Sequence, residues 1–216
     1  MGYRAVALSQ VGGAGGEHIS YELARKLGFA YLNEAIIAQV AAGSGVDPAS
    51  VSEAERRKSF VTRVFEAAGR ARMDGVRSDS ALYLFDETDR FLSLIKNTVR
   101  DAADRGNVVL VAHAACYACA DRLDVLRVWV TAPLPVRVSR VASQHGISES
   151  EAAKSVRQSD AGRASYLKRV YGIGKESPAD YDLVVNTERL MPDDAVDIVI
   201  GLVQSSSASP LGASGG

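Results

Sequence analysis

The sequence of 216 residues has little of three features that would each define a class of protein. Two cysteines are too few for the disulfide framework of a small secreted domain. No run of about 18 apolar residues predicts a membrane span, and the apolar stretch near the N-terminus is too short for a signal-peptide core. Lys and Arg number 25 against 26 Asp and Glu, a net charge of -1 that gives no global basic field, although a local basic groove would escape this count. We therefore expect a cytoplasmic protein that binds neither membrane nor nucleic acid.

The composition is that of an ordinary globular domain, with 47% apolar and 24% charged residues. A chain of this length buries roughly 70% of its unfolded surface, enough for a proper core. We expect one domain over residues 1–204. The Ser/Gly-rich remainder, residues 205–216, predicts a disordered tail.

Short apolar runs alternate with helical patterns along the chain. The runs that predict strands are residues 5–8, 29–32, 108–112, 126–131 and 183–185. The patterns that predict helices are residues 19–27, 34–42, 52–73, 86–104, 135–144, 149–169 and 192–203. Alternation of this kind is typical of an α/β fold with a parallel sheet covered on both sides. We expect five parallel strands, with residues 5–8 and 108–112 adjacent and central because their runs are continuously apolar.

A glycine-rich loop, residues 12–16, joins the first predicted strand to the first predicted helix. Glycines permit positive φ and let backbone N–H groups approach an anion, and the helix adds its positive end. The loop therefore predicts a phosphate site, with a tight turn that binds nothing as the alternative. The loop does not match the dinucleotide-binding motif G-x-G-x-x-G, because His18 stands at the position of its last glycine. Gly16 and His18 also stand where a standard P-loop has Lys and Ser/Thr.

Arginines cluster in the two helices expected after residue 134. Arg137 and Arg140 share one helix face, and Arg157 and Arg163 flank Asp160 on the next helix. Arginine suits phosphoryl groups because it is always charged and bonds in a bidentate fashion. The four arginines could reach one multiply charged ligand, with Asp160 orienting Arg157 or Arg163. The alternative is a solvated helix surface with local ion pairs.

Cys116 and Cys119 form a C-x-x-C motif, and His113 precedes it by three residues. A redox role needs a thioredoxin-like context, which is lacking. A structural zinc site needs four ligands, and the chain has no second cysteine pair. We expect buried thiols on a short helix and predict no metal site formed by protein ligands.

Four motifs in chain order resemble the cytidylate kinase-like branch of the P-loop nucleoside monophosphate kinases. Residues 9–19 resemble that family's S-R-x-x-G-S-G-G-R-x-I loop. The other three matches are residues 130–134 with Arg137 and Arg140 (its strand-to-helix step), residues 146–166 (its lid) and residues 181–187 (its last strand).

The resemblance implies a P-loop NTPase-like three-layer sandwich, with a five-stranded parallel sheet, a helical lid over residues 146–176 and an acceptor-binding helical insert over residues 41–86. It implies transfer of the ATP γ-phosphoryl group to a nucleoside monophosphate or related small acceptor, with ATP and Mg²⁺ as cofactors. The implied catalytic residues are Arg137, Arg140, Arg157, Asp160 and Arg163. The implied nucleotide-binding residues are Gly12, Gly13, Ala14, Gly15, Gly16, Glu17, His18, Asn186 and Thr187, the last two near the donor base.

The chain departs from the family pattern at phosphate-facing positions. Gln10 and Glu17 stand where the family has arginine, His113 replaces the arginine after the central strand, and Asn33 replaces an expected aspartate. Three cations are thus lost or weakened. This supports a second hypothesis, a catalytically impaired nucleotide-binding module of the same fold with a regulatory or interaction role. A purely structural or partner-binding descendant is a third.

Overall fold

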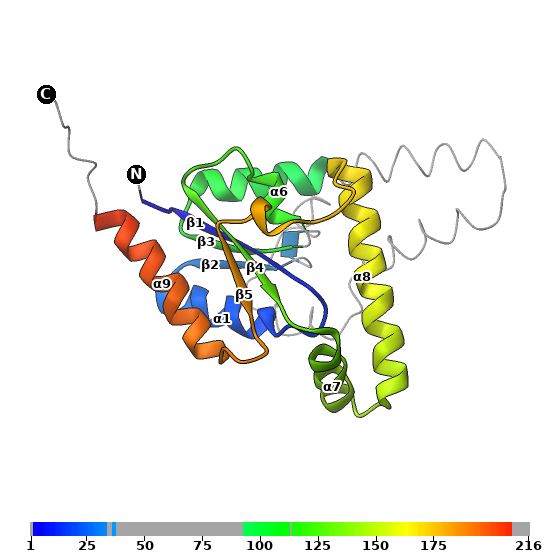
Figure 1. Cartoon of the computed structure of the whole chain (residues 1–216). Coiled ribbons are helices and arrows are strands. Elements are labelled where there is room, and N and C mark those ends of the chain that lie inside the picture. Colours follow the sequence, from blue (N-terminus) through cyan, green and yellow to red (C-terminus); the bar gives the residue numbers. More distant parts are fainter. Residues whose placement is uncertain (1, 34–35, 38–92, 113, 209–216) are drawn as a thin grey trace, which may run out of the picture.

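The computed structural model describes residues 2–33, 36–37, 93–112 and 114–208. These residues form a three-layer α/β sandwich around a parallel sheet (Figure 1). The expected acceptor-binding insert, residues 41–86, and the predicted helix over 52–73 lie outside the described residues.

All five strands are parallel, in the order β2-β3-β1-β4-β5. β1 therefore lies at the centre of the sheet with β3 beside it, which confirms the predicted placement of the two most apolar runs. The strands are β1 (Ala5–Gln10), β2 (Ala30–Asn33), β3 (Val108–Val111), β4 (Val125–Thr131) and β5 (Leu183–Asn186).

Three helices, α1 (Gly16–Leu27), α7 (Leu134–His145) and α8 (Glu149–Tyr171), begin and end within a few residues of their predicted bounds. Gly28 caps α1 in the left-handed conformation with φ 67°. α8 starts with a capping box in which Ser148 and Glu151 bond each other's backbone N–H groups. Residues 93–105 are helical, whereas most of the predicted helix over 34–42 and residues 86–92 of the one over 86–104 lie outside the described residues. The other elements are α6 (Ala115–Ala118), the 3-10 helix η2 (Pro178–Asp180) and α9 (Pro192–Ala208).

The core lies on both faces of the sheet, because successive side chains of a strand point to opposite sides. Val6 and Leu8 of β1 pack with α1 and α9 on one face. Ala5 and Ala7 pack with residues 93–105 and α6 on the other. Beyond the carboxyl ends of the strands stand α7 and α8, which pack on each other (Figure 1). The chain from β1 turns next to these two helices before it enters α1.

The last helix is longer than predicted. α9 runs to Ala208, so the first four residues of the expected tail are helical, and residues 209–216 lie outside the described residues. Ser206 explains part of the extension: its hydroxyl donates to the carbonyl of Val203 at 2.9 Å and accepts a bond from the Tyr3 N–H at 2.9 Å. Serine content therefore misled the boundary prediction. Within the described part of the chain, no helix combines the length and the hydropathy that a membrane span requires.

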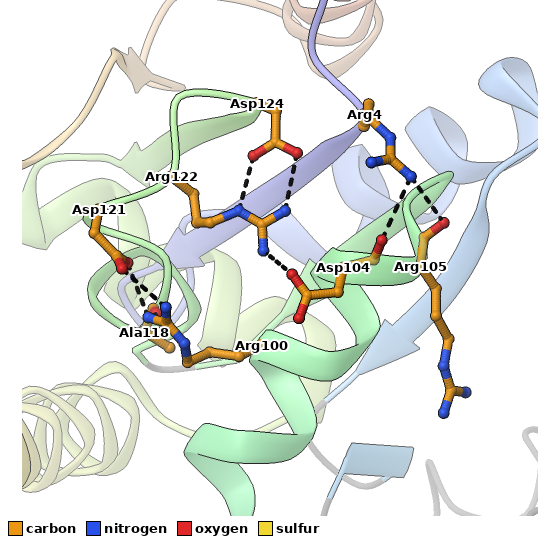
Figure 2. A network of polar contacts seen from close by, with 8 residues as sticks. All are labelled: Arg4, Arg100, Asp104, Arg105, Ala118, Asp121, Arg122 and Asp124. Carbon is orange, nitrogen blue, oxygen red and sulfur yellow. Dashed lines mark hydrogen bonds and ion pairs between the residues drawn. The ribbon is translucent and has the colours of Figure 1, made fainter.

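A network of ion pairs ties elements together at the amino-terminal edge of the sheet (Figure 2). Arg4 and Asp124 immediately precede β1 and β4. Arg122 donates to both carboxylate oxygens of Asp124, at 2.8 and 2.9 Å, and also to Asp104. The Arg122 guanidinium holds the pKa of Asp124 below its usual range. Arg4 adds bonds to the backbone carbonyls of Asp104 and Arg105, at 3.4 Å each. The network lies at the opposite edge of the sheet from the glycine-rich loop.

The layered core predicts a specific stability difference between two leucines. Leu8 is 0% exposed between β1 and its covering helices, whereas Leu123 is 90% exposed. We expect Leu8→Ala to lower the free energy of unfolding by about 2–5 kcal/mol, through lost burial and a residual cavity. The control Leu123→Ala should change it by less than about 0.5 kcal/mol. Urea denaturation measures both, and equal effects would contradict the proposed core.

Candidate phosphate site

The loop between β1 and α1 requires glycine for two separate reasons. Gly13 and Gly15 have positive φ values of 79° and 81°, which side-chain-bearing residues rarely adopt. A Cβ on Gly13 would lie 2.8 Å from the carbonyl oxygen of Arg137. A Cβ on Gly16 would lie 2.6 Å from Oε1 of Gln10. Conformation and close packing therefore both select glycine here.

Three backbone donors of the loop have no acceptor in the part of the chain that the structure describes. The Ala14 N–H bonds to the carbonyl of Val11 at 3.1 Å. None of the described residues accepts a hydrogen bond from the N–H of Gly13, Gly15 or Gly16. These donors lie at the positive end of α1, where backbone N–H groups and the helix dipole together favour an anion. The arrangement fits the phosphate site that the sequence predicts.

Carbonyl groups of the same loop are held by side chains from the elements behind it. Three of the donors are arginines of α7 and α8, and the fourth is a threonine just after β5. The bonds run from Arg163 Nη1 to Gln10 O (3.4 Å), from Arg137 Nη1 to Gly12 O (3.1 Å), and from Thr187 Oγ1 (2.8 Å) and Arg140 Nη1 (3.5 Å) to Ala14 O. The loop is thus anchored along its length through its acceptors, while its free donors remain available.

Arg137 connects the loop to both helices. Its side chain is 8% exposed. Nε donates to the carbonyl of Ala132 at 3.0 Å, and Nη1 donates to Gly12. Nη1 and Nη2 also form a bidentate pair with the carboxylate of Asp160 on α8, at 3.0 and 2.9 Å. A buried guanidinium needs such a set of partners to offset its desolvation.

The pairing of Asp160 differs from the sequence expectation. The spacing on α8 suggested that Asp160 orients Arg157 or Arg163, but the carboxylate pairs with Arg137 of the preceding helix. The reason is tertiary packing: α7 and α8 pack together, which brings Asp160 to Arg137. Arg157 is exposed, and none of the described residues pairs with it.

Arg163 is the most buried of these arginines, with 4% of its surface exposed. It pairs with both carboxylate oxygens of Glu176 and also donates to the hydroxyl of Tyr181 at 3.3 Å. Burial opposes the charge on the guanidinium, but the bonds to Glu176 outweigh this cost and raise the pKa of Arg163. Tyr181 in turn stacks on Trp129, with ring centroids 5.3 Å apart. This cluster fixes the segment after α8 against the sheet.

Thr187 and Arg140 form a second anchor beside the loop. Thr187 is 3% exposed, and its hydroxyl accepts a bond from Arg140 Nη1 at 2.8 Å while donating to Ala14. Arg140 Nη2 also donates to the carbonyl of Thr187 at 2.6 Å. Asn186 is exposed at the end of β5, and its Oδ1 accepts the N–H of Glu188 at 3.0 Å. The predicted location of Asn186 and Thr187 near a donor base stays a prediction.

The structure thus brings together most, but not all, of the predicted site residues. The loop, Arg137, Arg140, Asp160 and Thr187 form one connected set. Glu17 and His18 lie in the exposed first turn of α1. Direct contact of the arginines with a transferring phosphoryl group stays a prediction.

The sequence analysis missed the structural roles of two residues. Glu176 lies 13 residues from Arg163, beyond any helical spacing, and only the folded chain shows the pair. Asn33, noted as a departure from the family, accepts the N–H of Ile36 at 3.0 Å with its Oδ1. An Asn after a strand is a common helix-capping residue, so that role could have been anticipated.

The C-x-x-C motif forms two buried thiols, as predicted, with Cys116 on α6 and Cys119 directly after it. Cys116 and Cys119 are free cysteines, and Cys116 Sγ donates to the carbonyl of Ala7 at 3.2 Å. Burial raises the pKa of Cys116 to about 12 and that of Cys119 to about 11. His113 lies outside the described residues. Over the parts of the chain that the structure describes, no group of three potential metal-ligating side chains occurs.

These raised pKa values predict inert thiols in the folded protein. The thiolate is the reactive form, and at pH 8 both groups are almost entirely protonated as well as buried. We expect negligible reaction of the native protein with dithiobis(nitrobenzoate). Both cysteines should react rapidly after denaturation, when their pKa values return to about 8.5. Rapid labelling of either thiol before unfolding would contradict the buried arrangement.

The model of the Cytidylate kinase-like family matches residues 5–189, and the chain belongs to that family. It is 32% identical over 108 residues to the "Cytidylate kinase" of Methanopyrus kandleri, covering 46% of this chain and 56% of that protein. It is 34% identical over 97 residues to the "Cytidylate kinase" of Sulfolobus acidocaldarius, covering 45% and 53%. The chain therefore spans about half the length of these curated relatives that it matches.

Solved structures share the fold. An uncharacterized protein from Eubacterium ventriosum aligns with a TM-score of 0.66 at 17% identity, over 93% of this chain and 98% of that one. The shikimate kinase from Bacteroides thetaiotaomicron aligns with a TM-score of 0.53 at 15% identity, over the same shares of the two chains. At these identities the likeness shows the P-loop kinase-type α/β fold and nothing about the substrate.

Proposed function

We propose that this protein is a nucleotide kinase that transfers the γ-phosphoryl group of ATP to a nucleoside monophosphate or a related small acceptor. The observation that carries the proposal is the loop before α1, where the N–H groups of Gly13, Gly15 and Gly16 have no acceptor among the described residues. Membership of the Cytidylate kinase-like family supports it. The cytidylate kinases among the relatives make CMP the first acceptor to test.

In this proposal the loop binds the donor phosphates and α8 supplies a cation. Phosphoryl transfer depends mainly on positioning and on neutralising charge, with little covalent help from the protein. The free N–H groups and the positive end of α1 would bind phosphate oxygens. Arg157 is exposed on α8 without a partner among the described residues, so its guanidinium is available to a substrate phosphate. Arg137 and Arg163 already have protein acceptors.

Magnesium fits the donor set of this site. Mg²⁺ is commonly held by one or two carboxylates together with substrate phosphates. Glu17, exposed in the first turn of α1, supplies a carboxylate next to the loop, and we propose that it holds the metal. A bound Mg²⁺ neutralises phosphate charge. Without metal, the Glu17 carboxylate and a triphosphate repel each other, as Coulomb's law requires for like charges.

The metal assignment predicts that ATP binding depends on Mg²⁺. By calorimetry, we expect Mg²⁺ to tighten ATP binding to the wild type by about tenfold or more. Glu17→Gln should bind metal-free ATP more tightly than the wild type and gain less from Mg²⁺. The control Glu149→Gln removes an acid from the first turn of α8 and should behave like the wild type. An unchanged Mg²⁺ dependence in Glu17→Gln would remove Glu17 from the site.

A nucleotide-binding module without turnover is the second candidate. The observations that favour it are the missing loop cations at Gln10 and Glu17 and the neutralisation of Arg163 by Glu176. Release of ADP from ATP and Mg²⁺ across a panel of nucleoside monophosphates separates the two candidates. Tight ATP binding without ADP release for any acceptor would favour the module.

The kinase proposal makes Arg157 more important for turnover than for binding. Arginines that stabilise the charge of a transferring phosphoryl group contribute about a thousandfold or more to rate. We expect Arg157→Ala to lower kcat at least about a hundredfold while the Kd of ATP changes far less. The control Lys154→Ala removes an exposed cation one turn earlier on α8 and should retain activity. Equal kcat in wild type and Arg157→Ala would overturn this role.

The same measurement on Arg163 has a different expected outcome. Removal of one partner from a buried ion pair costs about 3–5 kcal/mol of stability, because the other charge is left unpaired. Arg163→Ala should therefore lower the melting temperature as well as turnover, since Glu176 loses its only cationic partner among the described residues and keeps the bond from the Tyr181 hydroxyl. Arg157→Ala should leave the melting temperature unchanged. Normal stability of Arg163→Ala would contradict the buried pair.

A further inference from the structure

Two peptide planes of the loop decide which way its donors face. The plane between Gly12 and Gly13 carries the Gly12 carbonyl and the Gly13 N–H. Two residues later, the plane between Ala14 and Gly15 carries the Ala14 carbonyl and the Gly15 N–H. The chain has no cis peptide bond among the described residues. In a trans peptide the C=O and the N–H point in opposite directions. Whatever holds these two carbonyls therefore also aims the two N–H groups.

Buried side chains hold both carbonyls. Arg137 Nη1 lies 3.1 Å from the Gly12 oxygen, and Thr187 Oγ1 lies 2.8 Å from the Ala14 oxygen. A flip of the Gly12 peptide would leave one buried N–H of Arg137 without its acceptor, which costs the desolvation of that group. A flip of the Ala14 peptide would leave the Thr187 hydroxyl only its longer bond to the Thr131 carbonyl, at 3.4 Å. Either flip would also turn a carbonyl oxygen toward the anion, where the two negative groups repel. Both planes are therefore fixed from the side opposite to the site.

The two donors are themselves fixed by charged neighbours. Asp160 holds the Arg137 guanidinium through two bonds, at 3.0 and 2.9 Å. Arg140 donates to the hydroxyl of Thr187 at 2.8 Å, which leaves the hydroxyl hydrogen for the Ala14 carbonyl. Asp160 belongs to α8, the predicted lid helix, and no described hydrogen bond joins it to the loop directly. The path from Asp160 to the loop therefore runs through Arg137, beside the direct bond from Arg163 of the same helix to the Gln10 carbonyl at 3.4 Å.

We propose that Arg137 and Thr187 are positioning residues that aim the N–H groups of Gly13 and Gly15 at phosphate, and that Asp160 couples helix α8 to this loop through Arg137. The proposal rests on the proposed function, because it assumes that the loop binds phosphate. In this proposal Arg137 acts on the loop carbonyl and does not itself contact the phosphate. It also predicts that a carboxylate without contact to the nucleotide sets the affinity of the loop.

The hydroxyl of Thr187 offers the sharpest test, because valine has nearly the same shape. We expect Thr187→Val to weaken ATP binding in the presence of Mg²⁺ by about tenfold, through loss of the bond to Ala14. Thr187→Ser keeps the hydroxyl and should restore most of the affinity. If only the size of the side chain mattered, Thr187→Val would bind ATP at least as tightly as Thr187→Ser. Equal Kd values for valine and serine variants would overturn the role of Thr187.

Asp160 tests the coupling to α8. We expect Asp160→Asn to raise the Kd of ATP by about tenfold, with Asp160→Glu recovering part of the loss because it restores the charge. Gln158→Ala, an exposed neighbour on α8, is the control and should match the wild type. Wild-type affinity in Asp160→Asn would overturn the coupling. If Asp160→Asn fails to fold, the ATP affinities of Asp160→Glu, Thr187→Val and Thr187→Ser test the proposal.

A measurement without nucleotide separates this proposal from the proposed function. In the free protein, NMR order parameters of the Gly13 and Gly15 amides should fall from about 0.85 toward 0.6 or lower in Asp160→Asn and Thr187→Val. Core amides such as that of Leu8 should remain rigid. If the wild type binds no nucleotide but these order parameters fall, the function is wrong and the positioning role stands. Unchanged order parameters together with an unchanged Kd would refute the positioning role.

Discussion

The ion pair between the buried guanidinium of Arg137 and the partly exposed carboxylate of Asp160 is the interaction on which the site depends. The pair joins α7 to α8, and Arg137 Nη1 also donates to the Gly12 carbonyl. A guanidinium can be buried to 8% exposure only if nearly all its donors find acceptors, because desolvation of an unpaired charge is too costly. The requirement for a full set of partners therefore fixes three elements relative to one another. The shape of the loop follows from that geometry.

The charges around the loop explain how the missing cations can be tolerated. Asp160 and Glu176 neutralise Arg137 and Arg163 on the protein side. The opposite side presents backbone N–H groups and the end of α1, which attract an anion through fixed dipoles. Fixed dipoles need no reorganisation when charge moves in a reaction. In the proposed function the mobile positive charge then comes from Mg²⁺ and from Arg157.

The fold was predictable because its signals are local. Apolar runs marked the strands, Gly28 marked the end of α1, and the Ser148 capping box marked the start of α8. The loop was predictable for the same reason, since four of its five residues are glycines. The partners of Arg137 and Arg163 were not, because they lie 23 and 13 residues away and meet only after α7 and α8 have packed. Helical spacing suggested Arg157 or Arg163 as the partner of Asp160, but packing of α7 on α8 pairs it with Arg137.

Arginines of one sequence motif therefore differ in what they can do. To reach a phosphate, Arg163 would first have to leave Glu176 in surroundings where a carboxylate without a partner is costly. Arg157, six residues earlier on the same helix, is exposed and loses little when it moves. The free energy of changing partners, and not the residue type, separates a group that contacts substrate from one that shapes the site. By this criterion the buried pairs set the geometry of the loop, and the exposed groups around its mouth are the ones free to respond to a bound nucleotide.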